Sequence, residues 1–284
     1  MQIAIASGKG GTGKTIIATN LAYLLSRNGK RIAYLDCDVE EPNAHLFFDI
    51  EECNREDVTI PVPKVDMEAC NLCRKCSDLC EYGAIITVGK KVLTFQELCH
   101  GCGGCSLVCP QEAISELPHK VGEIIHLSFQ ENPNLTITYG LLDVGEAMAV
   151  PVIREVKRQP ISADLVIIDS PPGASCPVIE SVKESDFVVL VTEPTPFGLN
   201  DLELAVGMLK KLGLPFGILI NQVGLGDDRV HRYCAKEKIP ILLEIPYSRE
   251  IAELYSRGTV FLAELPEYEQ MFQKLYHSIE EMAA

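Results

Sequence analysis

The sequence predicts an α/β protein in which a mostly parallel sheet is covered by helices on both faces, with a small α+β domain inserted. Apolar runs such as "QIAIAS", "DLVIIDS" and "FVVLVTEP" alternate with helix-length segments, which is typical of parallel strands buried on both faces. Residues 59–119 interrupt this pattern with cysteine, glycine and proline. We therefore expect one α/β domain formed by residues 1–58 and 120–284, and one insert formed by residues 59–119.

The elements follow in order along the chain. A strand at 2–7, a glycine-rich turn at 8–15, a helix at 16–28 and the strand "RIAYLD" form a βαβ unit. An amphipathic hairpin, "GEIIHLSFQ" and "LTITYGLL" around "ENPN", begins near residue 121. Helices near 146–157, 178–184 and 199–212 then alternate with strands that include "FGILIN" and "ILLEIP", and an amphipathic, acidic helix that we expect to pack on the core follows Pro266.

Composition excludes several classes of protein. The 284 residues carry a net charge of −15, from 25 basic and 40 acidic residues, which disfavours non-specific binding to nucleic acid or to anionic lipid. No run of 18 apolar residues and no secretory signal occurs, so we expect a cytoplasmic protein without a membrane segment.

The turn after the first strand matches the phosphate-binding pattern G-x-x-x-x-G-K-[ST]. It consists of Gly8, Lys9, Gly10, Gly11, Thr12, Gly13, Lys14 and Thr15. Glycines let backbone N–H groups surround phosphates, the lysine reaches the β- and γ-phosphates, and the final hydroxyl binds Mg²⁺. We expect an ATP/ADP and Mg²⁺ site.

Eight of the 12 cysteines form two C-x2-C-x2-C-x3-C loops. A shift of 29 residues maps one loop onto the other, together with Ala84–Ile85 onto Ala113–Ile114, which indicates a duplicated unit. This spacing is typical of [4Fe–4S] clusters held by thiolates, whereas zinc knuckles need paired C-x2-C units with a longer spacer.

"KGGTGKT" resembles the deviant phosphate loop of the MinD/ParA/Mrp family of dimeric P-loop ATPases, which includes nitrogenase iron protein. The resemblance implies that Lys9 reaches the nucleotide of a partner subunit across an ATP-state homodimer, or a heterodimer with a similar ATPase. It implies that Lys9, Lys14 and Asp38 are catalytic, with Asp38 orienting the attacking water. By the same resemblance Asp169 holds the Mg²⁺ shell with Thr15, Gly173 senses the γ-phosphate and Asn221 reads adenine.

Alternatives stay open for Asp38, for its neighbour Asp36 and for Asn221. Asp38 and its neighbour Asp36 could instead be capping or solvated acids, and Asn221 could be a simple turn residue at a strand end.

The cysteine loops resemble those of two-cluster bacterial ferredoxins, in which the fourth cysteine of each loop serves the other cluster. The resemblance implies two ligand sets for two [4Fe–4S] clusters. The first set is Cys70, Cys73, Cys76 and Cys109, and the second is Cys99, Cys102, Cys105 and Cys80. Cys37, Cys53 and Cys234 have no partner motif and are expected to be structural, and for Cys176 a small buried residue is favoured over a role at a dimer interface.

The whole pattern is similar to that of MinD-superfamily ATPases with an inserted ferredoxin domain. This implies a slow, partner-stimulated ATPase that passes clusters or electrons to a protein acceptor, in iron–sulfur or metallocofactor assembly. ATP-gated electron transfer, as in nitrogenase iron protein, is the second hypothesis, and a positioning switch of the MinD or ParA kind is the third.

Overall fold

The computed structural model describes residues 1–48, 52–129, 132–160 and 162–283. Its strands are β1 (Gln2–Ala6), β2 (Ile32–Asp36), β3 (Glu52–Val65), β4 (Ile85–Val88), β5 (Lys91–Thr94), β6 (Ile114–Ser128), β7 (Leu135–Leu142), β8 (Leu165–Asp169), β9 (Phe187–Thr192), β10 (Phe216–Val223) and β11 (Ile241–Pro246). Its α-helices are α1 (Lys14–Arg27), α2 (Lys75–Leu79), α3 (Gly104–Leu107), α4 (Ala149–Arg158), α5 (Cys176–Val182), α6 (Pro196–Leu212), α7 (Arg229–Glu237), α8 (Arg249–Ser256), α9 (Phe261–Glu264) and α10 (Glu269–Ala283).

The main sheet has nine strands in the order β11-β10-β9-β1-β8-β2-β7-β6-β3. Every pair from β11 to β7 is parallel, so the predicted α/β fold with a mostly parallel sheet is confirmed. The last two strands pair antiparallel, β6 with β7 as the predicted hairpin and β3 with β6. Glu131, the first residue of the predicted hairpin turn, lies outside the described residues.

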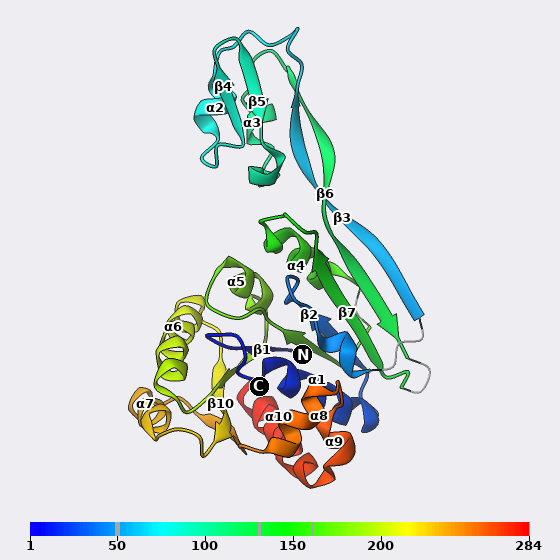
Figure 1. Ribbon diagram of the computed structural model, residues 1–284, viewed down its shortest axis with the longest axis vertical. Coiled ribbons are helices and arrows are strands. Elements are labelled where there is room, and N and C mark those ends of the chain that lie inside the picture. The colour runs from blue at the N-terminus through cyan, green and yellow to red at the C-terminus, as the bar shows by residue number, and fades with distance from the viewer. Residues whose placement is uncertain (49–51, 130–131, 161, 284) are drawn as a thin grey trace.

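Two hydrophobic cores cover the two faces of the sheet. On one face α1, α8, α9 and α10 pack against residues that include Ile3, Ile5 and the fully buried Tyr34. On the other face α4, α5, α6 and α7 pack against residues that include Ala4 and Ala6 (Figure 1). Alternate residues of β1 therefore serve opposite cores, as expected for a strand buried on both sides.

The sequence patterns located most elements of the main domain but missed several others. No strand was expected at 52–65, yet β3 pairs with β6 along its whole length and runs through the predicted boundary at residue 58. Prolines at 61 and 63 obscured it, and they are tolerated because β3 is the edge strand of the sheet. Helices α7 and α8 were also not expected. No described helix is long and apolar enough to cross a membrane, and α10 packs on the core as predicted.

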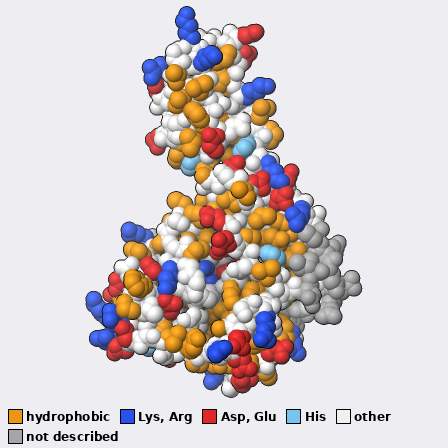
Figure 2. All heavy atoms as spheres, in the orientation of Figure 1, with side chains coloured by type: hydrophobic (Ala, Val, Ile, Leu, Met, Phe, Trp, Pro, Cys, Tyr) orange, Lys and Arg blue, Asp and Glu red, His pale blue; other side chains and the backbone are white. Residues whose placement is uncertain are grey.

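The cysteine-rich segment forms a separate small module at the far end of the β3–β6 ribbon (Figure 1). The module contains α2, α3 and the two-stranded sheet β4–β5. A narrow waist connects it to the larger body (Figure 2). We call residues 66–113 the cysteine module.

The waist is where the ribbon changes direction and is tied to the larger body. The register of β3 against β6 shifts between Val58 and Thr59, because Val121 has no partner residue in β3. A bulge of this kind bends a strand pair and increases its twist. The Val121 carbonyl accepts a hydrogen bond from the Asp143 N–H (3.0 Å), and His119 lies 2.8 Å from Glu146. Residues 143–148 thus connect the waist to α4.

Gly140 in β7 lies under α4, where a Cβ atom would sit 2.6 Å from Val39 and 2.7 Å from Val152. We expect Gly140→Ala to lower the free energy of unfolding by about 1–3 kcal/mol, because an overpacked core must shift backbone or side chains. Gly207→Ala in α6 is the control, since its Cβ would meet nothing within 4 Å. Urea unfolding of both variants measures the difference, and equal stabilities would contradict this packing.

Candidate nucleotide site and cysteine module

The phosphate loop joins β1 to α1 and is fixed by close backbone contacts. A Cβ on Gly8 would lie 2.1 Å from the Asp201 carbonyl oxygen of α6, so only glycine fits between loop and helix. Gly13 adopts a left-handed conformation (φ 95°), and its Cβ would lie 2.5 Å from the Asn221 side-chain nitrogen. The loop therefore has the shape in which backbone N–H groups can turn toward a phosphate chain.

Three charged residues are buried side by side beneath this loop. Lys14 begins α1, while Asp36 and Asp169 end the neighbouring strands β2 and β8, and all three are at most 6% exposed. Burial raises the pKa of Asp169, and Lys14 opposes this rise. Burial likewise raises the pKa of Asp36, and repulsion from Asp169 adds to it. Such a cluster is costly unless cations or hydrogen bonds compensate it.

Asp169 has the contacts that a magnesium site requires. Its Oδ2 accepts a hydrogen bond from the buried Tyr34 hydroxyl (3.0 Å), which orients the carboxylate. Among the described residues no partner contacts its buried Oδ1, and the hydroxyl of Thr15 lies close enough to lower its pKa. A buried oxygen without a partner beside the phosphate loop fits a hydrated Mg²⁺ ion, which binds through few carboxylates plus phosphate and water.

Asp36 and Asp38 have different roles in the structure. Asp36 accepts hydrogen bonds from the backbone N–H groups of Asp38 (3.0 Å), Asn43 (3.1 Å) and Ala44 (3.1 Å), so it shapes the loop that follows β2. This is the capping alternative. Asp38 is only half-buried and lies near Lys14, and burial raises its pKa to about 6. Its predicted role in orienting water stays a prediction.

Lys9 and Gly173 are both engaged within the chain. The Lys9 ammonium pairs with Glu193, which also accepts a hydrogen bond from Thr195. The Gly173 N–H donates to the Ser7 carbonyl (2.9 Å). Each group must leave its partner before it can contact a phosphate. Glu193 was not singled out from the sequence, although its position just after β9, beside β1, was the available signal.

A cavity of about 190 Å³ adjoins the phosphate loop on the side of α8. Asn221 lines it, donates a hydrogen bond to the Thr12 carbonyl (2.9 Å), and accepts one from the Gln222 N–H (2.9 Å). The remaining lining includes Gly11, Gly13, Ile16 and residues 245–255. The lining of the cavity is mostly apolar, as a purine base prefers, and its wall from residues 245–255 was not predicted.

The eight module cysteines line two hollows, and Cys76 lines both of them. Cys80, Cys99, Cys102 and Cys105 line a cavity of about 360 Å³. Cys70, Cys73, Cys76 and Cys109 line a narrower hollow of about 10 Å³, so those thiols must turn outward to hold a cluster. We call the first hollow the waist site and the second the tip site. Each set takes its fourth thiol from the other loop, so the two sites interlock.

The donor chemistry of both sites fits an iron–sulfur cluster. Among the described residues no three Cys, His, Asp or Glu side chains converge on a point that could hold a single metal ion. At the waist site the thiols surround a space, whereas at the tip site they would have to turn outward to hold a multi-iron cluster. Backbone N–H groups already approach two sulfurs, Gly101 to Cys99 (3.5 Å) and Ala113 to Cys109 (3.3 Å).

The duplication of the module extends to its backbone. Left-handed residues recur at the 29-residue offset, Leu72 with Gly101 and Arg74 with Gly103. The hydrogen bond from the Asp66 N–H to the Ala113 carbonyl (2.8 Å) has its counterpart 29 residues away in the bond from Phe95 to Ala84 (2.8 Å). The two halves of the module are therefore related by an approximate two-fold axis.

The other cysteines divide into buried and exposed thiols. Cys37 and Cys234 are buried, as expected of structural residues. The side chain of Cys53 lies outside the described part of the chain. The expectation that Cys176 is buried was wrong, because it is exposed at the first position of α5.

Comparison with known proteins agrees with this geometry. Residues 3–261 match the CobQ/CobB/MinD/ParA nucleotide binding domain, so the chain belongs to this family of P-loop ATPases. The uncharacterized protein MJ0579 of Methanocaldococcus jannaschii is 31% identical over 92% of this chain and 91% of its own length. The iron-sulfur cluster carrier protein of Pyrococcus abyssi is 23% identical over 99% of this chain and 87% of its own length.

The fold is also that of a solved family member. The septum site-determining protein MinD of Pyrococcus horikoshii, complexed with Mg-ADP, superimposes with a TM-score of 0.61 at 21% identity. The match covers all of this chain and 97% of that one. The family match and this structure confirm the predicted P-loop α/β fold and the ATPase class, while the ferredoxin character of the insert stays a prediction.

Asp38→Asn tests the charge balance of the site. Because its folded pKa of about 6 exceeds the usual value near 4, the ionised carboxylate destabilises the nucleotide-free fold as pH rises from 4 through 6. We expect the variant to be as stable as the parent chain at pH 4. Above pH 6 it should be more stable by about 1–2 kcal/mol, after allowance for partial exposure. Equal stability at both pH values in thermal unfolding would refute the raised pKa.

Proposed function

We propose that the chain is an ATP-switched iron–sulfur protein in which nucleotide state gates electron transfer through two [4Fe–4S] clusters held by the cysteine module. One observation carries the proposal: two interlocked four-thiol sets and a phosphate loop stand in one chain. An interlocked cluster cannot leave without loosening both loops, which favours clusters that stay bound. One electron enters from a reduced one-electron donor, which is oxidised, and leaves to a protein acceptor, which is reduced.

At the nucleotide site the chain's own residues supply positioning and charge. Lys14 and the loop N–H groups would hold the phosphates, while Thr15 and Asp169 would hold a Mg²⁺ ion that neutralises part of their charge. Asp38 orients the attacking water. Lys9 leaves Glu193 to reach the nucleotide of a second subunit, so hydrolysis accompanies formation of a dimer, with the same chain or with a similar ATPase.

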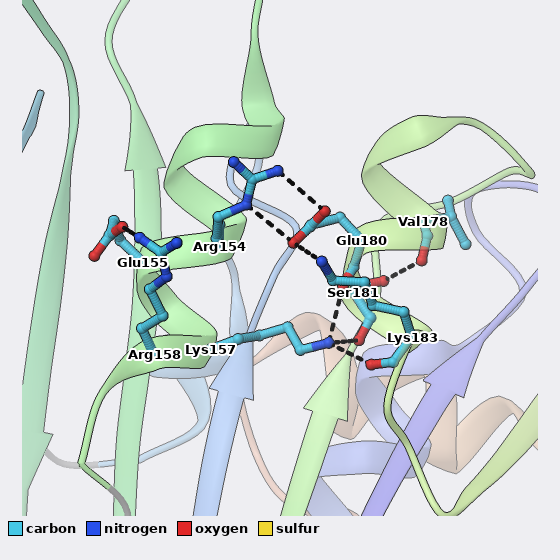
Figure 3. A network of polar contacts seen from close by, with 8 residues as sticks. All are labelled: Arg154, Glu155, Lys157, Arg158, Val178, Glu180, Ser181 and Lys183. Carbon is cyan, nitrogen blue, oxygen red and sulfur yellow. Dashed lines mark hydrogen bonds and ion pairs between the residues drawn. The ribbon is translucent and has the colours of Figure 1, made fainter. Parts of the chain in front are cut away.

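A continuous set of contacts links the γ-phosphate sensor to the module. Gly173 precedes α5, and the carboxyl end of α5 is tied to α4 by hydrogen bonds (Figure 3). Lys157 of α4 donates to the carbonyls of Glu180 (2.9 Å), Ser181 (3.0 Å) and Lys183 (2.6 Å). Arg154 also pairs with Glu180 (3.3 Å).

From α4 the contacts continue to the waist. The loop that leads into α4 contacts Val121 and His119 at the bend of the β3–β6 ribbon. Movement of α5 on release of the Gly173 N–H from Ser7 would therefore displace α4 and tilt the ribbon. A bistable element of this kind converts a small change at a phosphate into a large displacement elsewhere.

Delivery of a cluster to an acceptor protein in iron–sulfur or metallocofactor assembly is the second candidate function. The similarity to the iron-sulfur cluster carrier protein of Pyrococcus abyssi favours it. So does the volume of the waist site, which is wide enough to release a cluster with less rearrangement than the tip site.

Stopped-flow oxidation of the reduced, anaerobically reconstituted protein tests the gating. With a redox dye as the electron acceptor, we expect Mg·ATP to change the oxidation rate several-fold in the parent chain. In Lys14→Ala we expect no ATP effect with unchanged iron content, since Lys14 belongs to the phosphate loop and not to the cysteine module. A rate that ignores ATP in the parent chain would contradict gating.

Lys157→Met tests the contact route. Its loss frees three carbonyls at the end of α5, so we expect the ATP effect on dye oxidation to shrink while ATP hydrolysis persists. Lys183→Met is the matched control, because its exposed side chain pairs with Glu180 (2.7 Å) and its loss leaves the three carbonyl bonds of Lys157 in place. An undiminished ATP effect in Lys157→Met would exclude this route.

A further inference from the structure

The duplication of the module allows its two sites to be compared position by position. Residues 29 apart occupy equivalent places beside the two sets of thiols. Ser77 and Thr87 contact each other at the tip site, through the Thr87 N–H and the Ser77 hydroxyl (3.2 Å). Ser106 and Glu116 contact each other at the waist site, through the Ser106 hydroxyl and the Glu116 carboxylate (3.0 Å). Equivalent positions of the two halves therefore contact each other, through the backbone of Thr87 in one half and the side chain of Glu116 in the other.

Charge breaks this symmetry. The tip site is lined by Arg74, where the waist site has Gly103. The waist site is lined by Glu116, where the tip site has the neutral Thr87. Glu81 adds a second carboxylate to the waist site, and its equivalent is Pro110.

These charges stand close to the loops that carry the thiols. A Cβ on Gly103 would lie 3.1 Å from Glu116 Oε1, so the carboxylate rests against the loop between Cys102 and Cys105. Arg74 is itself the residue between Cys73 and Cys76, and it keeps the strained left-handed conformation (φ 66°) that glycine takes in the other loop. Strain of this kind is tolerated where a side chain has a use there.

A cluster that accepts an electron becomes more negative by one charge. A nearby guanidinium stabilises that added charge and nearby carboxylates oppose it, and net charge around a cluster is one determinant of its reduction potential. We propose that the module is electrically polarised, with Arg74 giving the tip site the higher reduction potential and Glu116 and Glu81 giving the waist site the lower one. This rests on the proposed function, since it requires both sites to hold clusters.

A higher reduction potential at the tip site than at the waist site determines the order in which the two sites take up electrons. The waist site is lined by Pro61 and Pro63, whereas the tip site is lined by Val65, which is further along β3 from the bend. A single electron therefore resides at the tip, away from the ATPase body. The second electron enters the waist site, next to the moving ribbon, and is the more strongly reducing of the two.

Redox titration of the anaerobically reconstituted full chain, monitored by electron paramagnetic resonance with dithionite as reductant, tests this assignment. We expect two separate one-electron waves, and Cys99→Ser should abolish or alter the lower one. The informative variants give each site the residue of its counterpart. Glu116→Thr should raise the lower potential and Arg74→Gly should lower the higher one, so that each variant brings the two waves together.

Two controls distinguish the effect of the Glu116 charge on the reduction potential from the effect of its side-chain size. Glu116→Gln keeps the side chain's size and should shift the lower wave in the same direction as Glu116→Thr. Both shifts should be larger at low ionic strength, because exposed charges are screened by salt. Waves that coincide, or that do not move in either variant, would overturn the polarity while leaving ATP gating intact. A chain that takes up no clusters would overturn the proposed function as well.

Discussion

The burial of like charges beneath the phosphate loop is the constraint on which the rest of the structure depends. Three parallel strands end side by side, and two of them place carboxylates, Asp36 and Asp169, where water does not reach. Lys14, Tyr34 and the N–H groups of the loop after β2 compensate them only in part, and Asp169 retains an oxygen with no partner among the described residues. The site is thus arranged for a cation and a polyphosphate, and the loops around it can respond when these bind.

The second feature that shapes the molecule is the β3–β6 ribbon. It is continuous with the main sheet at one end and supports the cysteine module at the other, so sheet and module cannot move independently of the bend at Val121. Helix α4 packs on this ribbon and is tied to α5, the helix that follows Gly173, the proposed γ-phosphate sensor. The insertion therefore lies at the part of the fold where nucleotide-dependent movement is expected, which is the basis of the proposal that its clusters respond to ATP.

Much of this arrangement could be predicted from the sequence, for identifiable physical reasons. Buried parallel strands are continuous apolar runs in the sequence, so the fold could be predicted. The phosphate loop needs glycines at fixed positions, so its place in the chain could be predicted as well. The β3–β6 ribbon could not be predicted, because proline interrupts most strands. Pro61 and Pro63 are tolerated here because β3 lies at the edge of the sheet. The partners Glu193 and Tyr34 could not be assigned either, since they meet Lys9 and Asp169 through tertiary contacts between strands distant in sequence. Exposure of Cys176 depends on the same tertiary packing.

Gated electron transfer requires clusters that stay in place while the ATPase turns over. The most direct measurement is retention of isotope-labelled iron: the anaerobically reconstituted chain is mixed with an apo-ferredoxin acceptor, with and without Mg·ATP, and the label is followed through many turnovers. For electron transfer we expect the label to remain on the chain, because each site is closed by a cysteine of the other loop. Label that moves to the acceptor only when ATP is hydrolysed would contradict it and would make the protein a cluster carrier.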